Sequence, residues 1–128
     1  MKQLKLLILG MSLIFSTTIF SDVAEVFTWK AEPGKDAELI QAFREAAKLH
    51  EKEGAIVSIE AMNVGDTQGT YQYVLRWDDV ISWGVSKDKI NTSPEWAAFG
   101  QKYAPGSLGT MTASITGLNL DPSVKAND

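Results

Sequence analysis

Residues 24–54 read AEVFTWKAEPGKDAELIQAFREAAKLHEKEG, and this stretch decides the fold. Over residues 24–31 one set of alternate positions holds Phe27 and Trp29, which is the side-chain period of a β-strand. The next four residues, Glu-Pro-Gly-Lys at 32–35, break the strand, because proline has no N–H for a β-ladder and glycine accepts turn conformations. The sequence therefore predicts a strand and then a tight turn.

A long amphipathic helix is predicted after this turn. Asp36 is the expected N-cap, because its carboxylate can accept hydrogen bonds from the free N–H groups of a first helical turn. Gly54 is expected just beyond the last turn, where glycine often takes a left-handed conformation. The predicted apolar stripe, at helical spacing, consists of Leu39, Ile40, Phe43, Ala46, Ala47 and His50.

Two further strands are predicted in the middle of the chain. Residues 55–63 and 70–77 are rich in β-branched and aromatic residues, and both alternate between two faces. The segment between them, residues 64–69, is polar and contains two glycines, as in a hairpin connection. The middle of the chain thus predicts an antiparallel hairpin.

The carboxy-terminal half predicts helical structure and then a last strand. A helical segment is expected from residue 78 to about residue 87, followed by a charged break at residues 87–89. A second helix is expected to begin at residues 93–95, where Ser, Pro and Glu suit the N-cap and the first turn. The last strand is expected at residues 110–120, with a β-bulge at Gly117.

The element order is therefore β-α-β-β-α-β. This order predicts a ferredoxin-like α+β fold, in which one four-stranded antiparallel sheet carries its helices on one face. Every predicted strand has apolar residues on both faces, so the uncovered face needs a partner. An identical sheet from a second copy is the simplest cover, which predicts a homodimer.

The first 21 residues have the pattern of a secretory signal peptide. Lys2 and Lys5 precede an apolar stretch at residues 6–20, and cleavage is expected after Ser21. The apolar stretch is shorter than the ~20 residues of a membrane-spanning helix. We expect a periplasmic or secreted protein without stable membrane association after cleavage.

The remainder is expected to form one domain at residues 22–120 and a polar tail at residues 121–128. Without the two lysines of the signal, 10 basic and 16 acidic residues give residues 22–128 a net charge of −6. This charge argues against binding to nucleic acid. The chain has no cysteine and one histidine, and it lacks the ligand spacing of a metal site, so neither a metal nor a cofactor is predicted.

Several short motifs resemble the dimeric α+β barrel superfamily, in particular its antibiotic-biosynthesis-monooxygenase-like and NIPSNAP-like members. They are the turn at residues 32–35, the helix that ends at Gly54, the strand end Arg76-Trp77, and the sequence SPEWAAF at residues 93–99. The resemblance implies a homodimer whose two sheets close a barrel, with a small cleft between sheet and helices in each subunit. Members of this superfamily include cofactor-independent oxygenases, haem-degrading oxygenases, isomerases and proteins without known activity.

The haem-degrading branch has an Asn on the first strand and a Trp and a His around the second helical region. The matching positions in this sequence are Phe27, Ile90 and Gly100, and all three depart from that pattern. Haem binding or degradation is therefore the weaker alternative.

Two residues are candidates for acid–base chemistry. His50 could act as a base near neutral pH or as a haem ligand, or it could simply end the apolar stripe of its helix, where the helix dipole stabilises it. Tyr73 could donate a hydrogen bond to a carbonyl or phenolate oxygen, or it could serve only in packing. Aromatic side chains could line a pocket for a flat apolar ligand or belong to the core; they are Phe27, Trp29, Trp83, Trp96 and Phe99.

Two functions remain open from the sequence. The first is an exported homodimer whose aromatic cleft binds a small apolar or aromatic molecule and oxidises it as a cofactor-independent monooxygenase, with His50 or Tyr73 as the acting residue. The second is a non-catalytic periplasmic binding or structural dimer, in which the aromatic side chains fill the cleft. The sequence alone does not decide whether the protein is an enzyme.

Overall fold

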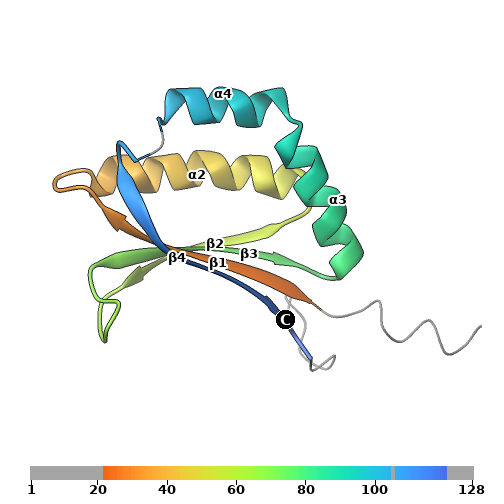
Figure 1. Cartoon of the computed structure of the whole chain (residues 1–128), viewed down its shortest axis with the longest axis horizontal. Coiled ribbons are helices and arrows are strands. Elements are labelled where there is room, and N and C mark those ends of the chain that lie inside the picture. Colours follow the sequence, from red (N-terminus) through yellow and green to blue (C-terminus); the bar gives the residue numbers. More distant parts are fainter. Residues whose placement is uncertain (1–21, 105, 121–128) are drawn as a thin grey trace, which may run out of the picture.

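The computed structural model describes residues 22–104 and 106–120. The expected signal peptide and polar tail lie outside these described residues. The sheet order is β2-β3-β1-β4, and every neighbouring pair of strands is antiparallel (Figure 1). The elements in chain order are β1 (Val23–Ala31), α2 (Asp36–Lys52), β2 (Ile56–Met62), β3 (Thr70–Trp77), α3 (Val80–Asn91), α4 (Pro94–Lys102) and β4 (Gly109–Leu118).

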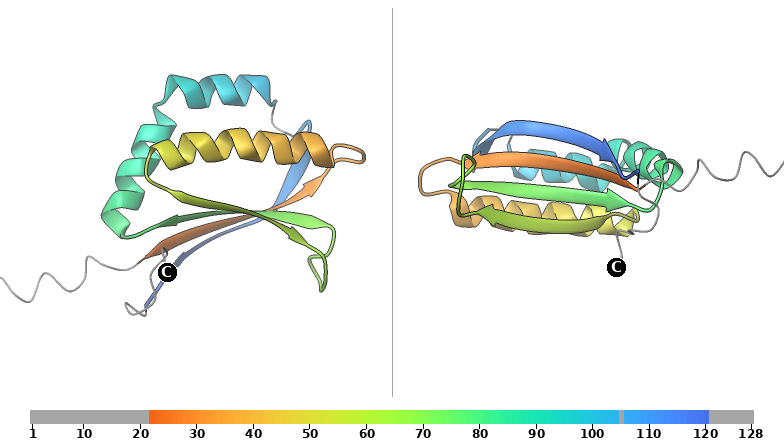
Figure 2. Two further views of the ribbon diagram at one scale, coloured as in Figure 1. Left: turned by 180° about the vertical axis from the view of Figure 1, so that it is seen from behind. Right: turned by 90° about the horizontal axis from the view of Figure 1, so that it is seen from below.

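The ferredoxin-like α+β fold is confirmed, with the helical half divided into α3 and α4. All helices lie on one side of the sheet, and α4 stands farther from the sheet than α2 (Figures 1 and 2). Seen from below, α2 lies behind the β2 side of the sheet and α4 behind the β4 side (Figure 2). None of the helices in the described part of the chain is both long and apolar enough to cross a membrane.

The core forms where α2 packs on β3. The predicted apolar stripe faces the sheet, and Leu39, Phe43 and Ala46 are buried. On β3 the side chains of Leu75 and Trp77 are each only 1% exposed. Burial of large side chains of this kind is worth about 1.5–3 kcal/mol each, so this interface provides much of the stability of the chain.

The amino terminus of α2 differs from the prediction. Lys35, not Asp36, is the N-cap residue, and its side chain makes no capping hydrogen bond. Asp36 is instead the first helical residue, and its carboxylate accepts a hydrogen bond of 3.0 Å from the Tyr71 hydroxyl. Asp36 and Glu38 still place negative charge in the first turn, where the helix dipole favours it.

The predicted charged break at residues 87–89 is wrong, because α3 continues through these residues to Asn91. Ser86 and Ile90 are buried one turn apart, while Asp88 and Lys89 are exposed to solvent. Charged residues on the outer side of a helix do not interrupt it. The expected start of the next helix is confirmed, because the Ser93 hydroxyl accepts a hydrogen bond from the Trp96 backbone N–H.

The predicted bulge at Gly117 is also wrong. Gly117 pairs regularly with Ala24, and the register between β1 and β4 shifts between Thr28 and Trp29. Thr112 is the extra residue there, and its hydroxyl donates a hydrogen bond of 3.3 Å to the Thr28 carbonyl. The extra donor on the threonine side chain compensates locally for the interrupted ladder.

No helix or strand of the described residues covers the sheet face opposite the helices (Figures 1 and 2). A row of side chains crosses this face from Ser58 through Val74 and Val26 to Ile115. Ile115 is 64% exposed, although it occupies a strand position beside Val26. Each neighbouring row contains polar residues, so the apolar part of this face is a narrow band at its centre.

Two glycines of β4 provide a test of the packing. A Cβ atom at Gly109 would lie 2.7 Å from the Lys30 carbonyl oxygen, whereas a Cβ atom at Gly117 would meet nothing within 4 Å. We expect Gly109→Ala to lower the free energy of unfolding by about 1–3 kcal/mol through overpacking. Gly117→Ala, the matched control, should leave it unchanged or raise it by up to about 1 kcal/mol. Urea unfolding followed by tryptophan fluorescence measures both, and equal effects would contradict this account of the packing.

Candidate functional site

A cavity of about 380 Å³ lies between the sheet and the helices on the α4 side. Its walls come from α2, α3, α4, β1, β3 and β4, and most of them are aromatic or aliphatic. Its volume exceeds the lower end of the range for small-molecule sites, about 300 Å³. This volume argues against a cleft that the aromatic side chains fill completely.

Six of the seven predicted site residues line this cavity: Phe27, Trp29, His50, Tyr73, Trp96 and Phe99. They come from four different elements, so the fold brings together residues that are far apart in the sequence. Trp83 is not among the lining residues.

The aromatic rings form a connected wall. His50 and Trp96 meet edge to face with their ring centroids 4.9 Å apart, and Trp96 stacks on Phe99 at 5.1 Å. Phe43, on the same helix as His50, contacts both Trp29, at 6.0 Å, and Tyr73, at 5.3 Å. These distances are in the range of favourable aromatic pairs, so the rings hold one another in place around the cavity.

His50 ends the apolar stripe of α2 and is buried against β3, with 8% of its surface exposed. Its Nδ1 atom lies 3.0 Å from the Ala46 carbonyl oxygen and 2.8 Å from the Tyr73 hydroxyl. A carbonyl oxygen can only accept, so the contact with Ala46 favours the tautomer with the proton on Nδ1, in which the Tyr73 hydroxyl does not donate to that nitrogen. This tautomer leaves the lone pair on Nε2 and allows the Tyr73 hydroxyl to keep its own proton for another acceptor.

Burial favours the neutral form of both residues. It lowers the pKa of His50, and the positive charge of Lys87 lowers it further, against the opposing effects of the Ala46 carbonyl and the Glu25 carboxylate. Burial also raises the pKa of Tyr73, and the charge of Glu51 adds to this. At neutral pH the pair is therefore a neutral imidazole and a neutral phenol, which are a base and a hydrogen-bond donor.

The protonation of His50 can be followed directly, because it is the only histidine in the chain. We expect an NMR titration of its imidazole to have a midpoint below 6.5, the ordinary value for the side chain. Since the pKa is lower in the folded state, the unfolded state binds more protons below pH 6.5, and the contribution of His50 to stability is lost as the pH falls through its folded pKa. A midpoint at or above 6.5 would contradict the buried, neutral imidazole.

A charged cluster beside the cavity was not predicted from the sequence. Glu25 lies on the helix-facing side of β1 and is only 4% exposed. Its carboxylate accepts a hydrogen bond of 2.9 Å from the indole N–H of Trp83 and one of 3.2 Å from the Lys87 ammonium group. Trp83 thus lies beside the cavity and holds the Glu25 carboxylate, instead of lining the cavity as predicted. The available signal was an acidic residue at an inward position of the strand, two residues before Phe27.

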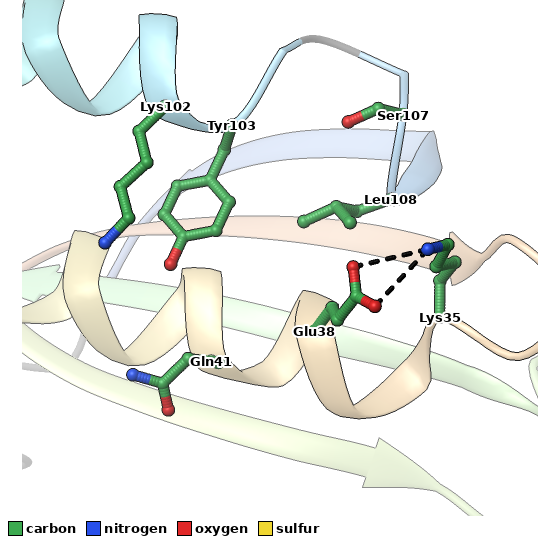
Figure 3. Close-up of a pocket in the computed structure, with 7 residues that line it drawn as sticks. All are labelled: Lys35, Glu38, Gln41, Lys102, Tyr103, Ser107 and Leu108. Carbon is green, nitrogen blue, oxygen red and sulfur yellow. Dashed lines mark hydrogen bonds and ion pairs between the residues drawn. The ribbon is translucent and has the colours of Figure 1, made fainter.

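A second hollow, of about 370 Å³, lies on the surface next to the cavity (Figure 3). Its walls are mostly polar and include Lys35, Glu38 and Lys102, and both lysines form ion pairs with glutamates. Tyr103 and Leu108 line both hollows and thus stand between them. The apolar cavity, with its buried base, is the better candidate for chemistry.

The three positions that correspond to the haem-degrading branch do not carry the Asn, Trp and His of that branch. Phe27, Ile90 and Gly100 all line the cavity, so the positions compared with the haem-degrading branch do belong to this site. None of these three side chains can coordinate iron. No group of three or more His, Asp or Glu residues within the described ranges could hold a metal ion.

Comparison with known proteins finds no matching family model and no matching curated protein. Solved structures do match. The chain resembles a NIPSNAP-like domain protein from Burkholderia xenovorans (15% identity, 78% of this chain and 84% of that chain, TM-score 0.59). It also resembles SnoaB, a cofactor-independent oxygenase from Streptomyces nogalater (17% identity, 79% and 93%, TM-score 0.51).

A third similar structure is a candidate antibiotic biosynthesis monooxygenase from Caulobacter crescentus (19% identity, 79% and 90%, TM-score 0.52). The structural neighbours are thus NIPSNAP-like and antibiotic-biosynthesis-monooxygenase-like proteins, which is consistent with the dimeric α+β barrel superfamily. At these identities the likeness establishes the fold.

Proposed function

We propose that this protein is an exported, homodimeric, cofactor-independent monooxygenase-like enzyme that oxidises a small apolar or aromatic molecule. The observation that carries the proposal is the neutral His50–Tyr73 pair in the wall of an aromatic cavity. That one structural neighbour is a cofactor-independent oxygenase adds support from the fold. Export is proposed from the pattern of residues 1–21 alone.

The cavity suits a flat aromatic substrate. Trp96 and Phe99, whose rings stack on each other, line the α4 side, and Phe27 and Trp29 form part of the sheet side. Stacking and edge contacts with such rings orient a flat molecule better than aliphatic walls do. The substrate would therefore lie between α4 and the sheet, within reach of α2.

The reaction we propose needs an acidic C–H bond in the substrate, next to a carbonyl group. Nε2 of His50 takes the proton, and the Tyr73 hydroxyl donates a hydrogen bond to the enolate oxygen that forms. The electron-rich enolate then reduces O₂, the new C–O bond forms on the carbon that lost its proton, and the peroxide anion takes the proton back from His50 to give a hydroperoxide. Loss of water from the resulting hydroperoxide converts a CH₂ group into a C=O group, with one O₂ consumed and one H₂O released.

Anthrone provides a test, because its central CH₂ group is acidic and one O₂ converts it to anthraquinone and one H₂O. We expect the purified protein to accelerate anthraquinone formation, measured by absorbance and O₂ uptake. His50→Gln should lower the rate by about 10²–10⁴-fold, the usual contribution of a general base, and Tyr73→Phe should also lower it.

Tyr71→Phe is the matched control. Tyr71 lies on the same strand and the same face as Tyr73, but its hydroxyl contacts Asp36 at the surface. Equal rates for wild type, Tyr71→Phe and Tyr73→Phe would remove Tyr73 from the mechanism. Oxidation no faster than in buffer, across anthrone and related acidic ketones, would contradict the proposed activity.

Occupation of the cavity can be tested with glycine substitutions. Gly100 on α4 lines the cavity, and a Cβ atom there would meet nothing within 4 Å. We expect Gly100→Leu to fold, because leucine favours a helix over glycine, and to abolish binding of aromatic ligands by filling the space. Gly84→Leu, on α3 and outside the cavity wall, also has room and should leave binding unchanged. Calorimetry or fluorescence titration measures the difference, and identical binding by both variants would place the ligand elsewhere.

The homodimer is proposed from the uncovered sheet face. Val26, Val74 and Ile115 form an apolar band there; Val74 is already buried at 4% exposed and Val26 is half-buried, whereas Ile115 is 64% exposed. An identical sheet packed on this face would bury the band. Native mass spectrometry of residues 22–128 should then give twice the chain mass.

A pair of substitutions locates the interface. Ile115→Asp should give a monomer, because it would bury an unpaired charge. Val64→Asp, at an 89% exposed position in the β2–β3 connection, should remain a dimer. A monomeric wild type, or a dimer that tolerates Ile115→Asp, would contradict this interface.

A further inference from the structure

We propose that Lys87 makes the cavity selective for aromatic ligands that carry one anionic oxygen group, such as a carboxylate or a phenolate. This inference rests on the proposed function, because it assigns the ligand class of the same cavity. It adds a specificity-determining residue on α3 to the His50–Tyr73 pair.

Lys87 stands out chemically among the lining residues. Of the described residues in the cavity wall it is the only one with a permanent charge, and the others are apolar, neutral polar or the neutral His50. Its side chain is 39% exposed and lines the cavity. A cation beside an apolar wall attracts an anionic group more strongly than it would in water, because the local dielectric is lower, although its ion pair with Glu25 offsets part of this attraction.

The ammonium group of Lys87 is held in place by Glu25, which lies outside the cavity wall. Lys87 Nζ lies 3.2 Å from each carboxylate oxygen of Glu25, and Trp83 donates its indole N–H to the same carboxylate at 2.9 Å. Trp83 and Lys87 are four residues apart on α3, so both point from one side of that helix towards β1. Glu25 is therefore anchored twice, and it in turn fixes the position of Lys87.

The arrangement presents the cation to the cavity and keeps the anion away from it. Lys87 lines the cavity and Glu25 does not. An ammonium group has three N–H donors, and the contacts with Glu25 use at most two of them. The remaining donor is available to a ligand oxygen, and a charge-assisted hydrogen bond of this kind is stronger than one between neutral groups.

A pair of matched probes tests the inference. 1-Anilinonaphthalene-8-sulfonate and N-phenyl-1-naphthylamine share the same aromatic body, and only the first carries an anionic group. We expect wild type to bind the sulfonate more tightly than the neutral probe, as measured by fluorescence titration. Lys87→Met should weaken sulfonate binding by about tenfold, the loss of one charge-assisted hydrogen bond, while affinity for the neutral probe stays within about twofold.

Three variants complete the design. Lys87→Arg should keep the preference for the sulfonate. Lys89→Met, on the same helix but outside the cavity wall and paired with Glu53, should change neither affinity. If Lys87→Met fails to fold because it leaves Glu25 buried without its partner, the double variant Lys87→Met/Glu25→Gln removes that charge and should show the same loss of preference.

The outcomes separate the two proposals. If both probes bind wild type but not Gly100→Leu, and Lys87→Met leaves their affinity ratio unchanged, the role of Lys87 is overturned while the cavity remains a binding site. If neither probe binds wild type, the proposed function falls, and the role of Lys87 falls with it.

Discussion

The packing of α2 against β3 is the interaction on which the rest of the structure depends. It buries the apolar stripe of α2 against Leu75 and Trp77, and it also contains the hydrogen bond between His50 and Tyr73. The candidate base is thus part of the main core interface. Its position is fixed by its own helix, through Ala46, and by the strand opposite. A site built on two packed elements keeps its geometry better than one built on loops.

The cavity exists because α4 packs less closely on the sheet than α2 does. None of the residues of α4 is fully buried, although the helix presents Trp96 and Phe99 to the cavity and its C-cap residue, Tyr103, also lines it. The short helix stands farther from the sheet than α2, and its large rings line a space instead of closing it (Figure 1). Apolar surface left open in this way forgoes part of the stabilisation that tighter packing would give. That unused stabilisation is available to an aromatic ligand.

Most of the helices and strands could be predicted from local sequence patterns. The alternation around Phe27 and Trp29, the stripe that ends at His50 and the Ser93 N-cap each depend on near neighbours in sequence, and the structure agrees with all three. The errors came from tertiary context. Asp36 accepts a hydrogen bond from Tyr71, which is distant in sequence, and the position of the bulge depends on the pairing of β4 with β1. Nothing local to either residue reveals such partners.

The site was predictable in composition but not in geometry. An aromatic-rich chain with one histidine on an apolar stripe suggested a lined pocket, and the structure brings His50, Tyr73 and four of the five predicted aromatic residues together. The Glu25–Trp83–Lys87 cluster joins positions about sixty residues apart. Glutamate, tryptophan and lysine are common residue types, and the buried ion pair and hydrogen bond form only because the fold brings the three side chains together. Trp83 was therefore assigned to the ligand, whereas it contacts Glu25.

Binding of an aromatic ligand in the cavity beside His50 is the property on which the proposed function depends. The single imidazole of the chain is a built-in reporter, because the ring current of a bound aromatic molecule shifts the resonances of neighbouring protons. The most direct measurement is an NMR titration of the His50 ring protons with N-phenyl-1-naphthylamine at constant pH. We expect a saturable shift of these resonances. The dissociation constant obtained from the shift should equal the one obtained from the fluorescence titration of the same probe. Binding that leaves the His50 resonances in place, or no binding at all, would contradict this expectation.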